Sequence, residues 1–476
     1  MLCTFYYDKM KNLFFIISII LISITSCVVG ENPVLKIEGG KIQGISTKTS
    51  GVSAFKGIPY AAPPVGDLRW KSPQPVIPWE GVKVADTYGP AAVQPPRQPG
   101  SFYYKEFFTN DGHKNSEDCL YLNIYTTAPG KMKAGLPVAM YIYGGAFATG
   151  YPYEKQFLGG EEWTKRGVIL VTISYRLNIF GFLAHPDLSS ESPNGVSGNY
   201  GILDQIAALK WVKNNIQQFG GDPNNITIFG QSAGAMSVQS LVTSPLSKDL
   251  MQKAIMQSGG GVSDKPLLGG TQLKDAEKTG KEIMDLGGYK NLKAMRAAPT
   301  DSILALTNLA RKKRIGGMMG PVIDGYVLSS NFSEAVRANK IADIPYIIGY
   351  NKDDMGMMTT GLGQFCKLRD ENGGKAYAYE FVRPLPGDTA GAFHSAELWY
   401  VFHTLGNSWR PFTEGDKVLS DYMVDTWTNF VKFGDPNGKG KEIWRPYTKE
   451  NQQFMIFKLG ASGDAQPAMG LPTHPQ

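Results

Sequence analysis

The chain has 476 residues, of which 42% are hydrophobic and 19% charged, values that are typical of a globular protein and exclude a disordered or fibrous chain. Its formal net charge of +6 is mild and no run of five basic residues occurs, so we expect no nucleic acid partner. The four cysteines show no CxxC spacing, which argues against a zinc ribbon or a disulfide scaffold.

A short apolar run near the N-terminus has the features of an export signal. Lys9 and Lys11 precede the run over residues 13–24, which has signal-peptide length and is too short to span a bilayer. The run ends in Ile-Thr-Ser before Cys27, and this ending resembles the bacterial lipobox, in which the cysteine becomes the lipidated first residue of the mature chain. We expect residues 1–27 to form a lipoprotein signal, with an ordinary cleaved signal as the alternative. Both predict an exported protein, tethered to a membrane of the cell envelope if Cys27 is lipidated and otherwise periplasmic or secreted.

Beyond residue 30, short apolar runs alternate with helical patterns, which is typical of an α/β sheet. The clearest runs lie at residues 137–143, 167–175, 225–230, 253–257 and 344–350. Their nearly continuous apolar character indicates strands covered on both faces. Residues 200–219 carry apolar side chains at helical spacing, and no repeat or charged linker divides the chain. We expect residues 28–476 to form one α/β domain with a mostly parallel, twisted sheet flanked by helices.

Residues 230–234, Gly-Gln-Ser-Ala-Gly, match the pattern GxSxG of the nucleophile elbow. Alone the pattern is weak, because 55 of the 476 residues are glycine. Its context is specific, since a predicted strand precedes it and an amphipathic helical pattern follows from Ala233 to Val242. Such a turn strains the serine backbone, lifts the hydroxyl above the sheet and aims a helix N-terminus at it. The sequence therefore predicts Ser232 as a nucleophile rather than as a serine that merely fills a tight turn.

A serine nucleophile needs a base, and in folds with this elbow the acid and the histidine follow the serine in the chain. Only His394, His403 and His474 do so. His474 lies two residues from the end of the chain and His403 follows an aromatic run, so we expect neither to be the base. His394 lies between a glycine-containing loop and an apolar helical segment, where a loop-borne base belongs. A metal motif HxxEH is excluded because Leu398 replaces its second histidine.

The acid that orients this histidine must lie between Ser232 and His394 in the chain. Asp353 and Asp354 follow the predicted strand 344–350 at its C-terminal end, where sheets of this class collect functional groups. We expect Asp354 to be the acid, with Asp353 as the alternative.

A glycine-rich segment upstream of the elbow is a candidate for stabilising an oxyanion. Residues 143–147, Tyr-Gly-Gly-Ala-Phe, follow a predicted strand and take the place of the HGGG-type loop of such folds. Small residues there allow backbone N–H groups to approach a substrate oxygen. We expect the N–H groups of Gly145, Ala146 and Ala233 to form the oxyanion hole.

Five segments make the sequence resemble the type-B carboxylesterases, the cholinesterase-like branch of the α/β-hydrolases. They lie at residues 55–70, 116–123, 143–147, 198–234 and 391–402. The resemblance implies the α/β-hydrolase fold and hydrolysis of small-molecule carboxylic esters in one catalytic domain, with no metal or other cofactor. Carried over onto this sequence, the family's catalytic residues fall on Ser232, Asp354 and His394, and its oxyanion amides on Gly145, Ala146 and Ala233.

Departures from the family pattern bear on substrate and stability. The family acid is commonly glutamate, one methylene longer than Asp354. Gln231 stands where the family often has glutamate, and residues 94–119 contain no tryptophan, so a choline ester is disfavoured because a quaternary ammonium needs anionic charge and aromatic faces. Ala92 stands where the family has the usual partner of the cysteine at Cys119, so we expect Cys119 to be a buried free thiol. The short stretch between the acid and the histidine favours a more open site, as in a bacterial enzyme of broad tolerance.

Several other functions are compatible with the same residues. A lipase, an aryl-ester esterase of the feruloyl type or an amidase would use the same residues as a carboxylesterase. A binding or adhesion protein on the same fold is the alternative from a different class. The presence of a serine, a histidine and a carboxylate in the expected order argues against this last alternative.

Overall fold

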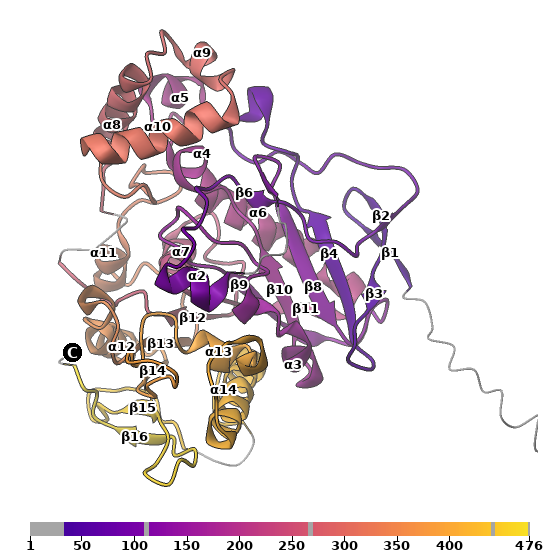
Figure 1. Ribbon diagram of the computed structural model, residues 1–476, viewed down its shortest axis with the longest axis vertical. Helices are drawn as coiled ribbons and strands as arrows, with labels where there is room; N and C mark the ends of the chain where they lie inside the picture. Colours follow the sequence, from indigo (N-terminus) through magenta and orange to yellow (C-terminus); the bar gives the residue numbers. More distant parts are fainter. Residues whose placement is uncertain (1–32, 109–113, 265–269, 439–442, 475–476) are drawn as a thin grey trace, which may run out of the picture. The chain divides into compact units, whose positions relative to one another are not determined.

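The computed structural model describes residues 33–108, 114–264, 270–438 and 443–474 (Figure 1). The predicted export signal, including Cys27, lies outside the described residues. The described residues belong to one compact unit. In the described ranges, no helix combines the length and the apolar character that crossing a membrane requires.

An 11-stranded sheet forms the centre of this unit. Its strands follow the order β16 (Ala468–Gly470), β15 (Phe454–Phe457), β14 (Ala376–Phe381), β13 (Tyr346–Asn351), β12 (Lys253–Gln257), β11 (Gly221–Gln231), β9 (Leu136–Ile142), β10 (Ile169–Ile173), β8 (Tyr121–Thr126), β4 (Ser53–Pro59) and β3 (Ile45–Ser46). The strands from β15 to β10 pair in parallel, and antiparallel pairs lie at both edges. The expected mostly parallel sheet is therefore confirmed.

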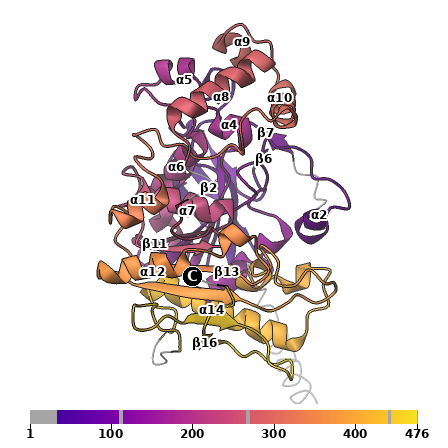
Figure 2. The same cartoon turned by 90° about the vertical axis from the view of Figure 1, so that its left-hand side faces the viewer.

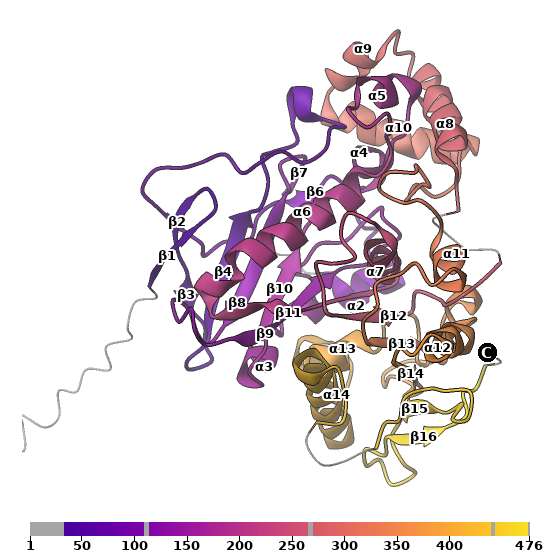
Figure 3. The same cartoon turned by 180° about the vertical axis from the view of Figure 1, so that it is seen from behind.

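Helices flank the sheet in two groups. In the first group, α6 (Tyr200–Asn215) and α7 (Ala233–Thr243) pack against each other and against β11, and Figure 3 shows α6 crossing the sheet. In the second group, α3 (Gly160–Lys165) and α13 (Leu398–Val401) both pack against the long helix α14 (Glu414–Phe433). The parallel strands are almost completely buried because helices cover them, as their continuous apolar sequences predict.

A smaller helical layer has its own apolar core. It consists of α4 (Asn178–Phe182), α5 (Pro186–Glu191), α8 (Leu273–Leu286), α9 (Leu292–Arg296) and α10 (Thr300–Lys313). Figures 1 and 2 show α8 to α10 at the end of the unit opposite the C-terminal strands.

The remaining elements are short. They are the sheet of β1 (Val34–Ile37), β2 (Gly40–Gln43) and β5 (Val82–Val84), the pair β6 (Ala91–Ala92) and β7 (Asn115–Ser116), the helices α2 (Phe102–Phe107), α11 (Phe332–Arg337) and α12 (Leu362–Glu371), and 3-10 turns at Gly66–Leu68, Lys155–Phe157, Gly356–Met358 and Leu405–Asn407. Cys119 and Cys366 are buried free thiols, as expected for Cys119.

The predicted strands and helices are present, with shifted ends. β11 begins at Gly221, earlier than its apolar run, because Gly221 pairs with Leu136 ahead of the irregularity that precedes Ile226. The helix predicted over residues 200–219 is α-helical to Asn215 and continues as a 3-10 turn, Ile216–Phe219. Gly220 then ends it with a φ of 85°, a conformation that favours glycine.

Candidate functional site

Ser232 lies on the sharp turn between β11 and α7. Its backbone has φ 58° and ψ −126°, a strained conformation for a residue with a side chain. Glycine is required on both sides, because a Cβ at Gly230 would overlap the Gly234 carbonyl and one at Gly234 would overlap the Ile142 carbonyl. The N–H of Ser232 donates to the carbonyl of Gln257 at the end of β12, over 2.9 Å. The turn thus has the backbone geometry of a nucleophile elbow.

His394 and Asp354 are in direct contact. Nδ1 of His394 lies 2.6 Å from Oδ1 of Asp354, whose side chain is fully buried. The N–H of Met355 donates to Oδ1 over 2.9 Å and the N–H of Asn351 donates to Oδ2 over 3.3 Å, so backbone groups hold the carboxylate in place. A carboxylate in this arrangement fixes the orientation of the imidazole and directs Nε2 to the side opposite Asp354.

Asp353 makes a different set of contacts from Asp354. Its Oδ2 accepts a hydrogen bond from the N–H of Ala392 over 2.7 Å, and its own N–H donates to the Ala392 carbonyl over 3.1 Å. Asp353 also forms an isolated parallel bridge with Phe393. This carboxylate therefore fastens the segment that carries His394 to the end of β13.

The other ring nitrogen of His394 faces the elbow. Nε2 of His394 lies 3.3 Å from the side-chain Nε2 of Gln231, the residue that precedes Ser232. Both His394 and Ser232 are more than nine-tenths buried. The structure thus gathers the elbow, His394 and Asp354 at the C-terminal ends of β11, β13 and β14, the edge where functional groups were expected.

The loop after β9 lies against the elbow. A Cβ at Gly144 would lie 2.9 Å from the Cβ of Ser232, so the two turns are in contact. Gly145, Ala146 and Phe147 have φ values of 103°, 57° and 55°, and this run turns the loop sharply. Within the part of the chain that the structure describes, the N–H groups of Gly145, Ala146 and Ala233 donate to no protein acceptor. Backbone donors left free beside a serine are suited to an oxyanion.

A buried glutamate that sequence reasoning did not assign to the site lies behind the histidine. Oε2 of Glu397 accepts from Nδ2 of Asn351 over 2.5 Å, and Oε1 accepts from Nε2 of Gln257 over 3.2 Å. Burial, and then the charge of Asp354, raise the pKa of Glu397 to about 7. Its place three residues after His394 in the sequence was the only local signal for this glutamate. In the described residues no cluster of candidate metal ligands occurs.

Helix α2 covers the turn that carries His394. The hydroxyl of Tyr103 donates to the carbonyl of His394 over 3.2 Å, and the ring of Phe102 meets that of Phe393 edge to face at 4.8 Å. Burial, and then the charge of Asp354, raise the pKa of Tyr103 to about 12. The sequence did not predict this helix, which is six residues long and has no apolar periodicity.

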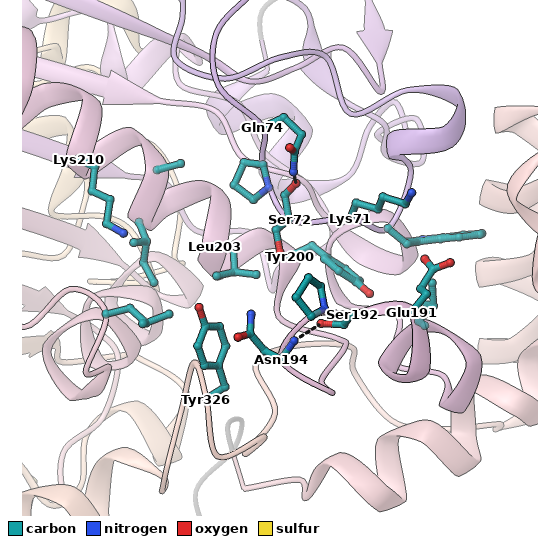
Figure 4. Close-up of a pocket in the computed structure, with 17 residues that line it drawn as sticks. Lys71, Ser72, Gln74, Glu191, Ser192, Asn194, Tyr200, Leu203, Lys210 and Tyr326 are labelled. Carbon is teal, nitrogen blue, oxygen red and sulfur yellow. Dashed lines mark hydrogen bonds between the residues drawn. The ribbon is translucent and has the colours of Figure 1, made fainter.

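His403 and His474, which also follow Ser232 in the chain, contact other partners, and a cavity is lined by other residues. His403 is 3.0 Å from Asp421, and Nε2 of His474 is 2.7 Å from the carbonyl of Lys352. A cavity of about 570 Å³ contains Lys71, Tyr200 and several other polar side chains (Figure 4), but no histidine and none of the predicted site residues line it.

Comparisons with known proteins agree on one family. The model of the carboxylesterase family matches residues 31–364 and 356–469. A fumonisin B1 esterase of Sphingopyxis macrogoltabida is 38% identical over 90% of this chain and 87% of its own, and the human cocaine esterase is 30% identical over the same shares. A solved carboxylesterase of Geobacillus stearothermophilus covers 92% of this chain and 97% of its own, with a TM-score of 0.77 and 30% identity.

Proposed function

Because the chain belongs to the carboxylesterase family, we propose that it hydrolyses carboxylic esters with Ser232 as nucleophile, His394 as general base and acid, and Asp354 as the acid that orients His394. The observation that carries this proposal is the 2.6 Å contact of His394 with Asp354, with the opposite ring nitrogen facing the elbow. The contacts of Asp353 with Ala392 favour Asp354 over its neighbour for this role.

The reaction proceeds through a covalent acyl-enzyme. His394 takes the proton from the Ser232 hydroxyl as the serine oxygen bonds to the ester carbonyl carbon, and the carbonyl oxygen becomes an oxyanion. When this intermediate collapses, the bond to the leaving oxygen breaks and His394 gives its proton to the alcohol. Water then attacks the acyl-enzyme by the same route, which releases the acid and restores the serine. Asp354 stabilises the imidazolium that forms in both halves.

The N–H groups of Gly145, Ala146 and Ala233 stabilise the oxyanion. Their place beside the elbow and their lack of protein acceptors in the described residues support this role. Because they are backbone groups in a water-poor site, they are oriented before the charge develops and need no rearrangement as it does. The N-terminus of α7 adds a favourable dipole at the same point.

Replacing the nucleophile tests the proposal. Ser232→Ala is expected to lower kcat on a p-nitrophenyl ester by roughly 10⁶-fold, because serine hydrolases lose this much when the nucleophile is removed. Ser237→Ala, a buried serine on α7, is the matched control and is expected to keep near-normal kcat. Near-normal turnover by Ser232→Ala would refute the assignment, and an inactive wild-type chain would favour the binding-protein alternative.

A panel of esters can determine which acyl and alcohol groups the enzyme accepts. A series of p-nitrophenyl esters from acetyl to long acyl chains separates a carboxylesterase from a lipase, and a feruloyl ester tests the aryl-ester alternative. Fumonisin B1 belongs in the panel because a relative that is 38% identical is named for it.

A further inference from the structure

A buried arginine joins α2 to the turn that carries His394. The Arg410 side chain is fully buried between two aromatic rings, with its guanidinium carbon 5.1 Å from the ring centre of Phe393 and 4.7 Å from that of Trp409. Phe393 directly precedes His394. Arg410 therefore lies against the side chain of the residue that precedes His394 in the chain.

The guanidinium is saturated with hydrogen bonds. Its Nε and Nη2 donate to the Glu106 carboxylate of α2, with a shortest distance of 2.7 Å. Its Nη1 donates to the carbonyl of Pro386 and to Asp388 over 2.9 Å each, and Nη2 also donates to Asp388 over 2.8 Å. All five N–H groups thus have acceptors, which come from two segments that are far apart in the sequence.

The segments that contain Glu106 and Asp388 are each connected to His394. Glu106 lies on the same short helix as Tyr103, whose hydroxyl donates to the His394 carbonyl. Asp388 lies in the loop that leads into His394, where it also accepts from the N–H of Ala390 over 3.0 Å. Arg410 is therefore a common hydrogen-bond partner of helix α2 and of the loop that carries His394.

Charge and geometry both suit an arginine at this position. The carboxylates of Glu106 and Asp388 face one guanidinium. Lys105 adds a second cation, whose ammonium lies 3.1 Å from the ring centre of Trp409. The indole N–H of Trp409 donates to Glu106 over 2.9 Å. The planar guanidinium fork reaches both carboxylates at once, whereas an ammonium is a point charge with three donors. A lysine would keep the charge but has three donors in place of five, so it leaves some of these acceptors without a partner.

We propose that Arg410 is a positioning residue for ester hydrolysis, because it locks α2 to the His394 loop and so fixes the imidazole over the elbow. The proposal rests on the proposed function of His394. Proton transfer by His394 occurs in acylation and in deacylation, so a displaced imidazole slows both, and a shift of about 1 Å costs on the order of 10²-fold in rate. Binding of a small ester does not depend on the imidazole to the same degree.

The test compares Arg410→Lys with Arg369→Lys. Arg369 is also a buried arginine, but it pairs with Asp343 and packs over Tyr346, at the end of β13 opposite Asp354. For each variant, intact sites are counted by titration with a fluorophosphonate, and kcat and KM for p-nitrophenyl acetate are measured per titrated site. We expect Arg410→Lys to lower kcat by roughly tenfold to a hundredfold with KM unchanged within about twofold, and Arg369→Lys to leave kcat per site unchanged.

Two outcomes overturn the proposal. They are a normal kcat per titrated site in Arg410→Lys, and an equal loss of kcat in both arginine variants, which would indicate general loosening of the fold.

If Arg410→Lys yields no folded protein, Tyr103→Phe replaces it, because this half-exposed side chain loses only the hydrogen bond to His394. The kcat of Tyr103→Phe is expected to fall several-fold while its melting temperature stays that of the wild type. An unchanged kcat in this variant would contradict the proposal. Failure of the proposed function is distinct, since it would show as near-normal turnover by Ser232→Ala.

Discussion

Two adjacent carboxylates follow β13 and make different contacts, Asp354 with His394 and Asp353 with Ala392, so we expect their replacement to have different effects. Asp354→Asn is expected to lower kcat by roughly 10⁴-fold, as loss of the orienting acid does in serine hydrolases, because the amide no longer stabilises the imidazolium. Asp353→Asn keeps an oxygen that accepts from Ala392 and is expected to cost less than about tenfold. Steady-state kinetics of the two variants on one p-nitrophenyl ester decide the matter, and a larger loss in Asp353→Asn would reverse the assignment.

Glu397 couples the stability of the site to pH. Its pKa is about 7 in the fold and about 4.5 in the unfolded chain, so between these values folded Glu397 holds a proton that the unfolded chain has released. The free energy of unfolding therefore falls as pH rises through this window. From pH 4.5 to 8, wild type is expected to lose about 3 kcal/mol relative to Glu397→Gln, as measured by urea denaturation. If the difference in free energy of unfolding between wild type and Glu397→Gln stays constant with pH, this coupling is contradicted.

The sequence predicts individual residues of the proposed site where local pattern determines them. Ser232 follows from the glycines and the strand-to-helix context, and His394 follows from chain order. The choice between Asp354 and Asp353 stayed open because both follow the same strand, and only their contacts separate them. Glu397 and Arg410 were missed because their partners, Asn351 and Glu106, lie far away in the sequence.

At the scale of elements, the loop after β9 depends on glycine. Gly145 has φ 103°, and a Cβ there would overlap the carbonyl of Thr149. Gly145→Ala is therefore expected to displace the oxyanion donors and to lower kcat by roughly 10²- to 10³-fold. Gly167→Ala is the control, since Gly167 has φ 75° with open space around its Cβ position and lies before β10. Equal effects of the two changes on kcat would refute a role for this loop in catalysis.

The elements themselves were largely predictable from the sequence, and their ends were not. The apolar runs of β9 to β13 reveal strands because both faces are buried, which removes the need for polar positions. Helix α2 was not predicted, since it is held by Arg410 and Trp409 from elsewhere in the chain and has no periodic pattern of its own. Tertiary contacts that sequence patterns do not carry therefore decide how the site is covered.

For the whole molecule, the N-terminal segment, residues 1–27, predicts the cellular location of the enzyme. We propose that Cys27 is lipidated and tethers the domain to a membrane of the cell envelope. In a bacterial host, the full chain is expected to incorporate labelled palmitate and to sediment with membranes, and Cys27→Ala is expected to lose the label. Incorporation of label by Cys27→Ala, or release of the wild-type chain into the soluble fraction, would contradict the anchor. Cys366→Ala, a buried thiol, is the control.

Covalent labelling of the serine tests the central claim most directly. The wild-type protein is treated with a fluorophosphonate, digested, and mapped by mass spectrometry together with Ser232→Ala. The account predicts one adduct, on Ser232, with loss of esterase activity in proportion to labelling, and no adduct in the variant. An adduct on another residue, or full esterase activity with Ser232 completely labelled, would contradict it.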